Sequence, residues 1–338
     1  MYGSVSGEVF SVLHSGSAAR GDRDGRKAMG MPPAADRTAF HSKPARLAKA
    51  ARFGKALADG ASRIGAFAKP CTLRIGVALC CLGVGAASAD VVRARYSVSL
   101  VGLHIGEVAA AGSLGAANYR VDLNARLTGI AAMLANVKMA LASTGALRKG
   151  VALPATFATT SSSSHETRTV RMALNAGTVK SVEIVPPWED REGRVPVTDA
   201  HKRNILDPTS AFIMAVPEDQ PLVGPAACNR TIPIYDGYIR FDVTLSYVGT
   251  KDVAVKGYSG PVSVCAARYA PVSGHKWDSR SARFMAQNRD IEAWLAPVPH
   301  AHVVVPFHVA LATLVGRAEI DAIEFSVEPS DVTATSTH

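Results

Sequence analysis

The chain has 338 residues, 48% of them hydrophobic, and a net charge of +9 at pH 7. That charge lies almost wholly in residues 1–89, where 13 Lys and Arg face 5 Asp and Glu, whereas residues 90–338 hold 24 against 23. The second stretch is near neutral, which argues against the nucleic-acid partner that the overall charge suggests. It is long enough to bury a large core as one all-β domain, or as two small ones, without a metal.

The beginning of the chain is predicted to be absent from the mature protein. Residues 1–74 are rich in Ala, Gly, Ser, Arg and Lys and have little apolar periodicity, a composition typical of disorder. Ile75–Ala86 form an apolar run behind Lys69 and Arg74, and Ala87-Ser88-Ala89 matches the small-residue site of a signal peptidase. The run is shorter than the roughly 20 residues of a membrane span. Residues 75–89 are thus predicted to be an export signal, cleaved after Ala89.

Alternatives to this interpretation stay open. A signal usually begins its chain, so the 74 residues before Ile75 indicate a start codon assigned too early. The alternative is a genuine basic arm that binds nucleic acid or anionic lipid. A buried core helix or an uncleaved anchor is the alternative to a cleaved signal. In the preferred interpretation the protein is periplasmic and its mature form has no transmembrane span.

After the signal, apolar and polar residues alternate with the period of a half-buried strand. The clearest case is Tyr119–Leu127, and the pattern recurs at 95–100, 169–174 and 240–247. Sheets with one wet face are normally antiparallel. We expect about ten to twelve strands from the turn spacing. Their apolar face must be covered by a second layer or line a ligand cavity, and its main residues are Leu100, Val121, Leu123, Val170, Leu174, Val243 and Leu245.

Turn and cap residues separate the predicted strands. Turns are expected at 115–118 and 175–177, and Asp236-Gly237 is a strong hairpin signal between 232–235 and 238–247. Short helices are expected over 198–206 and 279–288. Another is expected to begin with Asp207 as its N-cap and Pro208 at its first position, and to reach residue 214. These positions favour a cap for Asp207 and a turn for Asp236 over roles as site carboxylates.

A single domain is predicted for residues 90–328, because no Gly- or Pro-rich linker divides them. Residues 186–196 form a loop, but strands recur on both sides of it. The expected fold is all-β with a few short helices, built on a single curved, mostly antiparallel sheet or an open barrel. The tail 329–338 (PSDVTATSTH) has the composition of a disordered segment.

The cysteines are divided in the same way as the charge. Cys71, Cys80 and Cys81 lie in or beside the predicted signal, and only Cys228 and Cys265 follow it. An even pair in an oxidising compartment predicts one disulfide, with two unrelated buried thiols as the alternative. Such a link would constrain the unfolded chain by about 4 kcal/mol in the chain-entropy model.

Three stretches are typical of a known family: 206–211 (LDPTSA), 228–237 (CNRTIPIYDG) and 271–275 (PVSGH). With the first strand region, 96–108 (YSVSLVGLHIGEV), they resemble the exported proteins grouped as domain of unknown function 3108, over residues 96–325. The resemblance implies a periplasmic location in Gram-negative bacteria. It also implies an open, curved antiparallel sheet similar to the carriers and receptors of lipoproteins. The family has no agreed activity, so it supplies no catalytic residues.

Motifs that would indicate chemistry are weak. His300 and His302, with His308 nearby, follow a Pro-rich turn and have no Asp or Glu close in sequence, so no metal and no cofactor are expected. Ser161 to Ser164, His165 and Glu166 are consecutive, so their side chains diverge, which favours a polar loop over a catalytic triad.

The tryptophans are candidates for the lining of a ligand groove. They are Trp188, Trp277 and Trp294. Trp294 lies between Ile291 and Leu295 in an alternating stretch, which favours a packing role for it.

Together these features favour a non-enzymatic periplasmic protein with a role in the cell envelope. It would bind an apolar ligand, a lipid or a lipidated peptide, in a concave sheet, with about 0.8 kcal/mol gained per buried methylene. Expected partners are lipid, a lipoprotein or an envelope protein, and not nucleic acid. An envelope structural or protein-interaction module without a small ligand stays open. So does a hydrolase whose site is assembled from distant residues.

Overall fold

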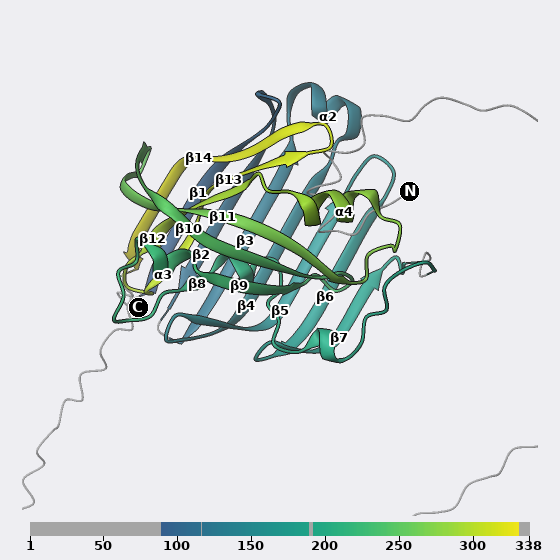
Figure 1. Cartoon of the computed structure of the whole chain (residues 1–338), viewed down its shortest axis with the longest axis horizontal. Coiled ribbons are helices and arrows are strands. Elements are labelled where there is room, and N and C mark those ends of the chain that lie inside the picture. Colours follow the sequence, from purple (N-terminus) through teal and green to yellow (C-terminus); the bar gives the residue numbers. More distant parts are fainter. Residues whose placement is uncertain (1–88, 116, 189–191, 331–338) are drawn as a thin grey trace, which may run out of the picture. The chain divides into compact units, whose positions relative to one another are not determined.

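A long antiparallel sheet contains most of the residues that the computed structural model describes, 89–115, 117–188 and 192–330 (Figure 1). The predicted leader 1–74, the predicted signal up to residue 88 and the tail from residue 331 lie outside these ranges. The described residues form fourteen strands, more than the sequence predicts. The strands are β1 (Ala89–Leu100), β2 (Leu103–Leu114), β3 (Asn118–Leu127), β4 (Lys138–Arg148), β5 (Val151–Ser162), β6 (Thr167–Asn175), β7 (Thr178–Val185), β8 (Met214–Ala215), β9 (Arg230–Tyr235), β10 (Arg240–Val255), β11 (Tyr258–Ser273), β12 (Ile291–Val298), β13 (Val303–Thr313) and β14 (Gly316–Ser330).

The order of strands brings the first and last strands together. It is β7-β6-β5-β4-β3-β2-β1-β14-β13-β12-β11-β10-β9, with β8 joined to β13. Each named pair is antiparallel, so the predicted all-β, antiparallel fold is confirmed. The predicted start of the tail needs correction. Pro329 and Ser330 continue β14 by pairing with Asp90 and Ala89.

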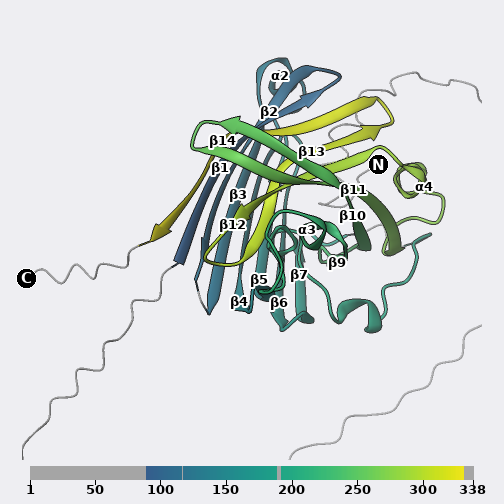
Figure 2. The same ribbon diagram turned by 60° about the vertical axis from the view of Figure 1, so that its left-hand side comes forward.

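The sheet curls so that its two ends meet, and Figures 1 and 2 show β9–β11 lying across the face of β3–β6. Residues 205–206 connect the two edges. Ile205 N donates to Gly177 O in the β6–β7 turn (3.0 Å), and Leu206 N donates to Pro233 O in β9 (2.8 Å). The predicted helix over 198–206 is therefore wrong. Within this range only η1 (Ala200–Lys202) is helical, because the backbone N–H groups of residues 205 and 206 form hydrogen bonds with the two sheet edges.

The β9–β10 loop closes the curl from the other side. Asp236 Oδ1 accepts the backbone N–H groups of Tyr238 (2.7 Å) and Ile239 (2.5 Å), so the loop spans residues 236–239 and β10 begins two residues later than predicted. Gly237 has φ +99, and a Cβ there would lie 2.6 Å from Val170 Cγ1 on β6. Only glycine fits this close approach of the loop to β6.

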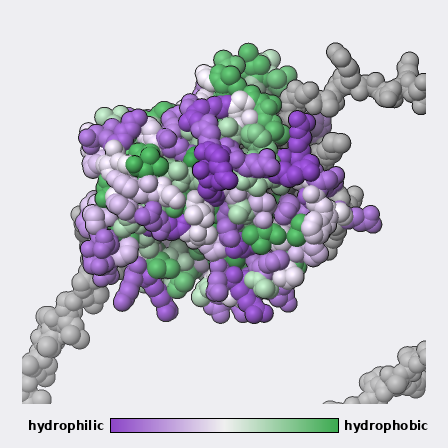
Figure 3. Space-filling view, viewed as in Figure 1, coloured by the Kyte–Doolittle hydropathy of each residue, from purple (hydrophilic) through white to green (hydrophobic). Residues whose placement is uncertain are grey.

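Short helices lie between the strands: α2 (Gly129–Ala135), α3 (Pro225–Cys228) and α4 (Arg280–Gln287). The predicted helix over 279–288 is confirmed as α4, whose N-cap Ser279 accepts a hydrogen bond from Ala282 N (3.1 Å). No described helix is long and apolar enough to span a bilayer. Figure 3 shows a group of apolar residues where Figure 1 places α2.

Buried apolar side chains form separate clusters. One surrounds Phe307 and Phe325, a second surrounds Cys228 and Cys265, and a third includes Val170 beneath the β9–β10 loop. Part of the concave face between these clusters is not filled by side chains.

Candidate functional site

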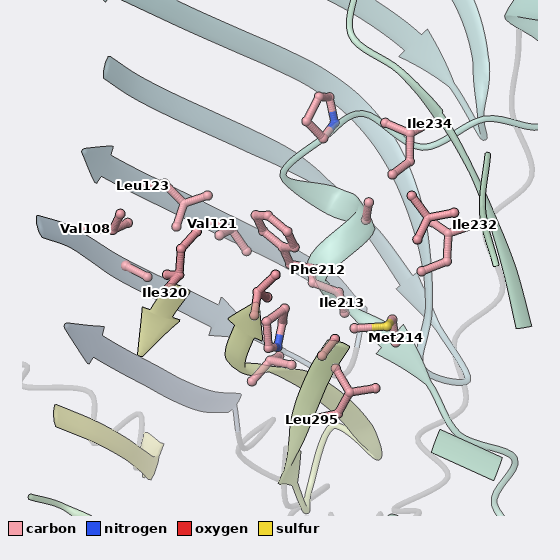
Figure 4. A pocket seen from close by; sticks show the side chains of 18 of the residues that line it. Val108, Val121, Leu123, Phe212, Ile213, Met214, Ile232, Ile234, Leu295 and Ile320 are labelled. Atoms are coloured by element: carbon pink, nitrogen blue, oxygen red, sulfur yellow. The ribbon is translucent and has the colours of Figure 1, made fainter. Parts of the chain in front are cut away.

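A cavity of about 420 Å³ lies on the concave face, within the roughly 300–1,000 Å³ of ligand pockets. One wall comes from β1–β4, with Val121 and Leu123 among its residues. The other comes from β9–β13, with Ile232 and Leu295 (Figure 4). Nearly all of the lining surface is apolar. The period of two explains this, because the polar residues of each strand point to the outer face.

The segment after Asp207 places an aromatic ring inside this cavity. Phe212 ends the 3-10 helix η2 (Ser210–Phe212), lines the cavity and is 41% exposed (Figure 4). Large apolar side chains are usually buried, so this ring has room for a contact that the chain itself does not supply. The predicted helix up to residue 214 is wrong, because Met214 pairs with Val304 of β13.

Asp207 fixes η2 to the sheet. Its Oδ1 accepts hydrogen bonds from Thr209 N (3.0 Å), Ser210 N (3.0 Å) and Ser143 Oγ of β4 (2.5 Å). Its Oδ2 accepts the Ser210 hydroxyl (2.5 Å), which also lies 2.6 Å from Tyr119 Oη. Burial raises the pKa of Asp207 above its ordinary value, and the four hydrogen bonds partly offset this effect.

Replacing Asp207 by alanine is expected to lower the free energy of unfolding by on the order of 3 kcal/mol. The reason is that two backbone N–H groups and two hydroxyls would lose their buried acceptor. Urea unfolding followed by circular dichroism measures the change. An unchanged midpoint and slope would contradict a fastening role for this carboxyl group.

Asp207→Asn is the matched control, because its Oδ1 can accept the same bonds and its amide can donate to Ser210. It also removes the titration. A raised folded-state pKa stabilises the fold below the ordinary value of 3.8, and this stabilisation is lost as pH rises through the folded pKa. The stability of the asparagine variant should therefore rise relative to wild type across that window. A difference that is constant with pH would contradict the shift.

A disulfide holds the second cavity wall. Cys228 at the end of α3 and Cys265 in β11 are joined with an S–S distance of 2.05 Å, so the predicted disulfide is confirmed. Both cysteines are fully buried, in one cluster with the cavity-lining Leu245 and Leu295. The link therefore fixes α3, and β9 that follows it, against the β10–β12 part of the wall.

Residues 95–322 match the family model described as "Protein of unknown function (DUF3108)". The chain belongs to this family. The match covers most of the described residues and most of the cavity lining, apart from Val92 and Ala94 of β1.

Other comparisons add little to this assignment. A solved structure similar to this DUF3108 chain is titled "Crystal Structure of Beta-barrel-like Protein of Domain of Unknown Function DUF1849 from Brucella abortus". It shares 10% identity, and the alignment covers 70% of this chain and 98% of the other, with a TM-score of 0.40. A score this low supports no inference. No curated protein matches the chain.

The predicted apolar face is divided in the DUF3108 chain. Val121, Leu123, Val243 and Leu245 line the cavity. Val170 and Leu174 pack in the cluster beneath the β9–β10 loop, and Leu100 packs against the cluster that contains Leu311 and Ala318. Pro208 and Asp236, expected only as cap and turn residues, also lie in the cavity lining.

Sequence reasoning missed the lining residues outside the clearest strands. They include Val108 and Ala110 of β2, Leu141 of β4, and Phe212 with Ile213. One signal was available: residues 211–216 (AFIMAV) are an apolar run. Such a run fits a segment that enters the interior of a sheet.

The histidines and the serine run have local partners. His300 contacts Asp90 (2.8 Å), His302 contacts Pro217 O (3.0 Å) and His308 contacts Asp321 (2.6 Å). The described residues include no group of His, Cys, Asp and Glu that could hold a metal. In the β5–β6 turn, Ser163 Oγ accepts the backbone N–H groups of His165 (3.3 Å) and Glu166 (3.2 Å).

The three tryptophans are absent from the lining of the cavity as the described residues define it. Trp188 stacks on Tyr238, with ring centroids 4.7 Å apart. Trp294 packs 4.2 Å from His308, and Trp277 lies exposed in a loop. The tryptophans, which were candidates for the lining of a ligand groove, therefore do not line this cavity among the described residues.

Proposed function

We propose that this DUF3108 protein acts in the periplasm, is not an enzyme, and binds an apolar ligand in the concave cavity. The ligand would be a lipid or a lipidated peptide, and the protein would serve the cell envelope. The observation that carries the proposal is the almost wholly apolar cavity of about 420 Å³, whose lining includes Phe212, a residue that is 41% exposed. Water is a poor occupant there, whereas an acyl chain would remove this surface from water.

Several polar groups beside the cavity already have partners within the chain, which favours binding by the apolar part of a ligand. Asp236 is bound to the backbone of its own loop, Glu292 accepts Trp294 Nε1 (2.5 Å), and His308 is paired with Asp321.

Arg268 also belongs to the lining, and its Nη1 donates to Ala267 O (3.3 Å), so an acidic head group would find its counter-ion there. No serine, threonine or cysteine is among the described lining residues. The lining hydroxyl groups belong to Tyr96, whose Oη donates to Pro306 O (2.7 Å), and to Tyr269, whose pKa is raised by burial, so neither is activated as a nucleophile for a hydrolase.

The location is supported by two features. The Cys228–Cys265 disulfide suits an oxidising compartment. The apolar run Ile75–Ala86 with its small-residue site suits export. The N-terminal residue of the protein isolated from the periplasm tests the predicted cleavage after Ala89.

Binding of fatty acids of increasing length is expected to tighten about fourfold per added methylene until the cavity is full. Each methylene transferred from water contributes about 0.8 kcal/mol. Delipidated protein would be titrated with the chain-length series by calorimetry, and lipid extracted after detergent-free purification would be analysed by mass spectrometry. Affinity that does not depend on chain length, with no lipid recovered, would refute the proposal.

One observation favours the alternative of an interaction module without a small ligand. The edge strand β7 has β6 as its sole strand partner among the described residues, so a further strand could add to its other edge beyond the turn that contacts Ile205. Recovery of a stable envelope protein bound through β7, without lipid, would favour this function.

A further inference from the structure

Apolar side chains gather at one end of the sheet. Ile130, Met133 and Leu134 of α2, with Val101 and Leu103 of the β1–β2 turn, are between 61% and 86% exposed. We call these five residues the apolar rim. Figures 1 and 2 both place α2 beside this turn, and Figure 3 shows the apolar group there. Exposed patches of this kind mark contact surfaces.

The composition of α2 does not suit a helix in contact with water. Its sequence GIAAMLA has no polar side chain, and none of its residues is buried. Helices that are apolar all round are normally enclosed by protein or lipid. The turn between β13 and β14 extends the patch, because Val101 N donates to Arg317 O (2.8 Å) and the neighbouring Leu314 and Val315 are exposed.

One cation beside the rim has no ion-pair partner among the described residues. Residues 125–140 include Arg126 and Lys138 and no Asp or Glu. Arg126 pairs with Glu107 of β2 (3.0 Å), whereas exposed Lys138 has no carboxylate within ion-pair distance among the described residues. Apolar side chains with a flanking cation fit the boundary between head groups and acyl chains of an anionic bilayer.

A protein partner fits this surface less well. Stable protein interfaces use about 20–30 residues on each side, which a short helix and two hairpin turns do not provide. A bilayer needs no matching shape. We propose that the apolar rim inserts into the surface of a lipid bilayer that contains anionic lipid.

The rim and the cavity are built on the same strands. Val108 of β2 and Ala125 of β3 pair with each other and line the cavity. Ile105 lies three residues before Val108, and Thr128 lies three residues after Ala125. Ile105 O accepts a hydrogen bond from Thr128 N (2.9 Å), directly before α2 begins. Docking would hold this end of the cavity wall against the bilayer. The inference goes beyond the proposed function and does not require a ligand in the cavity.

Flotation of the protein with vesicles of phosphatidylethanolamine and phosphatidylglycerol tests the inference. The Met133→Ser, Leu134→Ser double variant is expected to lower the bound fraction at least about tenfold, because two exposed side chains lose their apolar surface. Lys138→Gln should weaken binding about fivefold on these vesicles and have no effect on phosphatidylcholine. The matched control is Val151→Ser, an exposed valine at the opposite end of the β4–β5 hairpin, which should bind as wild type does.

Wild-type protein that stays unbound, or a double variant that floats as wild type does, would overturn the proposal. So would cross-linking of α2 to a protein partner without vesicle binding. Fatty-acid titration of the same variants in solution separates this test from that of the cavity. The double variant should keep wild-type affinity there, whereas failure of the cavity proposal would leave vesicle binding intact.

Discussion

Replacing Ala110 by phenylalanine is expected to weaken the binding of a long-chain fatty acid by about 100-fold while the sheet stays folded. Ala110 lies on β2, lines the cavity and is partly buried. A benzyl group there would occupy the space of several methylenes, each worth about 0.8 kcal/mol. Titration of the delipidated variant with a fluorescent fatty acid measures the loss.

Ala109→Phe provides the matched control on the neighbouring residue. Ala109 is exposed and, by the alternation of β2, points to the outer face. The Ala109→Phe variant adds the same side chain to the same strand outside the cavity, so its affinity for the fatty acid should equal that of wild type. Equal losses in the two variants would indicate a general disturbance of β2 and contradict the assignment of the cavity as the binding site.

Removal of the disulfide in the Cys228→Ala, Cys265→Ala variant should lower the free energy of unfolding by about 4 kcal/mol. The bond closes a loop with a sequence separation of 37, and its loss restores freedom mainly to the unfolded chain. Guanidinium unfolding under oxidising conditions measures the change. Fatty-acid affinity should fall as well, since the bond fixes one wall of the cavity.

Reduction of the wild-type protein supplies the comparison for this variant. Once reduced, the wild-type protein should unfold at nearly the same denaturant concentration as the double variant, because both lack the covalent link. A reduced protein as stable as the oxidised one would show that packing around Cys265, and not the link, stabilises the wall.

The strands were predictable where one face is wet. The alternation at Tyr119–Leu127 anticipates β3 to within one residue, since each polar residue must leave the interior. Residues 198–214 were not predictable in the same way. Leu206 and Met214 take extended conformations because Pro233 and Val304, distant in sequence, supply their backbone partners.

The cavity was predictable only as a possibility. The alternation shows that Val121 and Val170 lie on the apolar face of the sheet. It does not show that Val121 borders an open cavity and that Val170 lies in a closed cluster. That difference depends on the β9–β10 loop, whose Gly237 packs against Val170. Phe212 was hidden inside a predicted helix, whose actual course is set by the buried carboxyl group of Asp207.

The pairing of Ala89 with Ser330 places both ends of the described domain at the same end of the sheet. Both ends of the described domain leave the sheet side by side, at the end of β1 opposite to the β1–β2 turn. The 12 residues of β1 span roughly 40 Å at about 3.3 Å per residue. A molecule anchored at either terminus would therefore point α2 away from its attachment, free to reach across a gap of about that width.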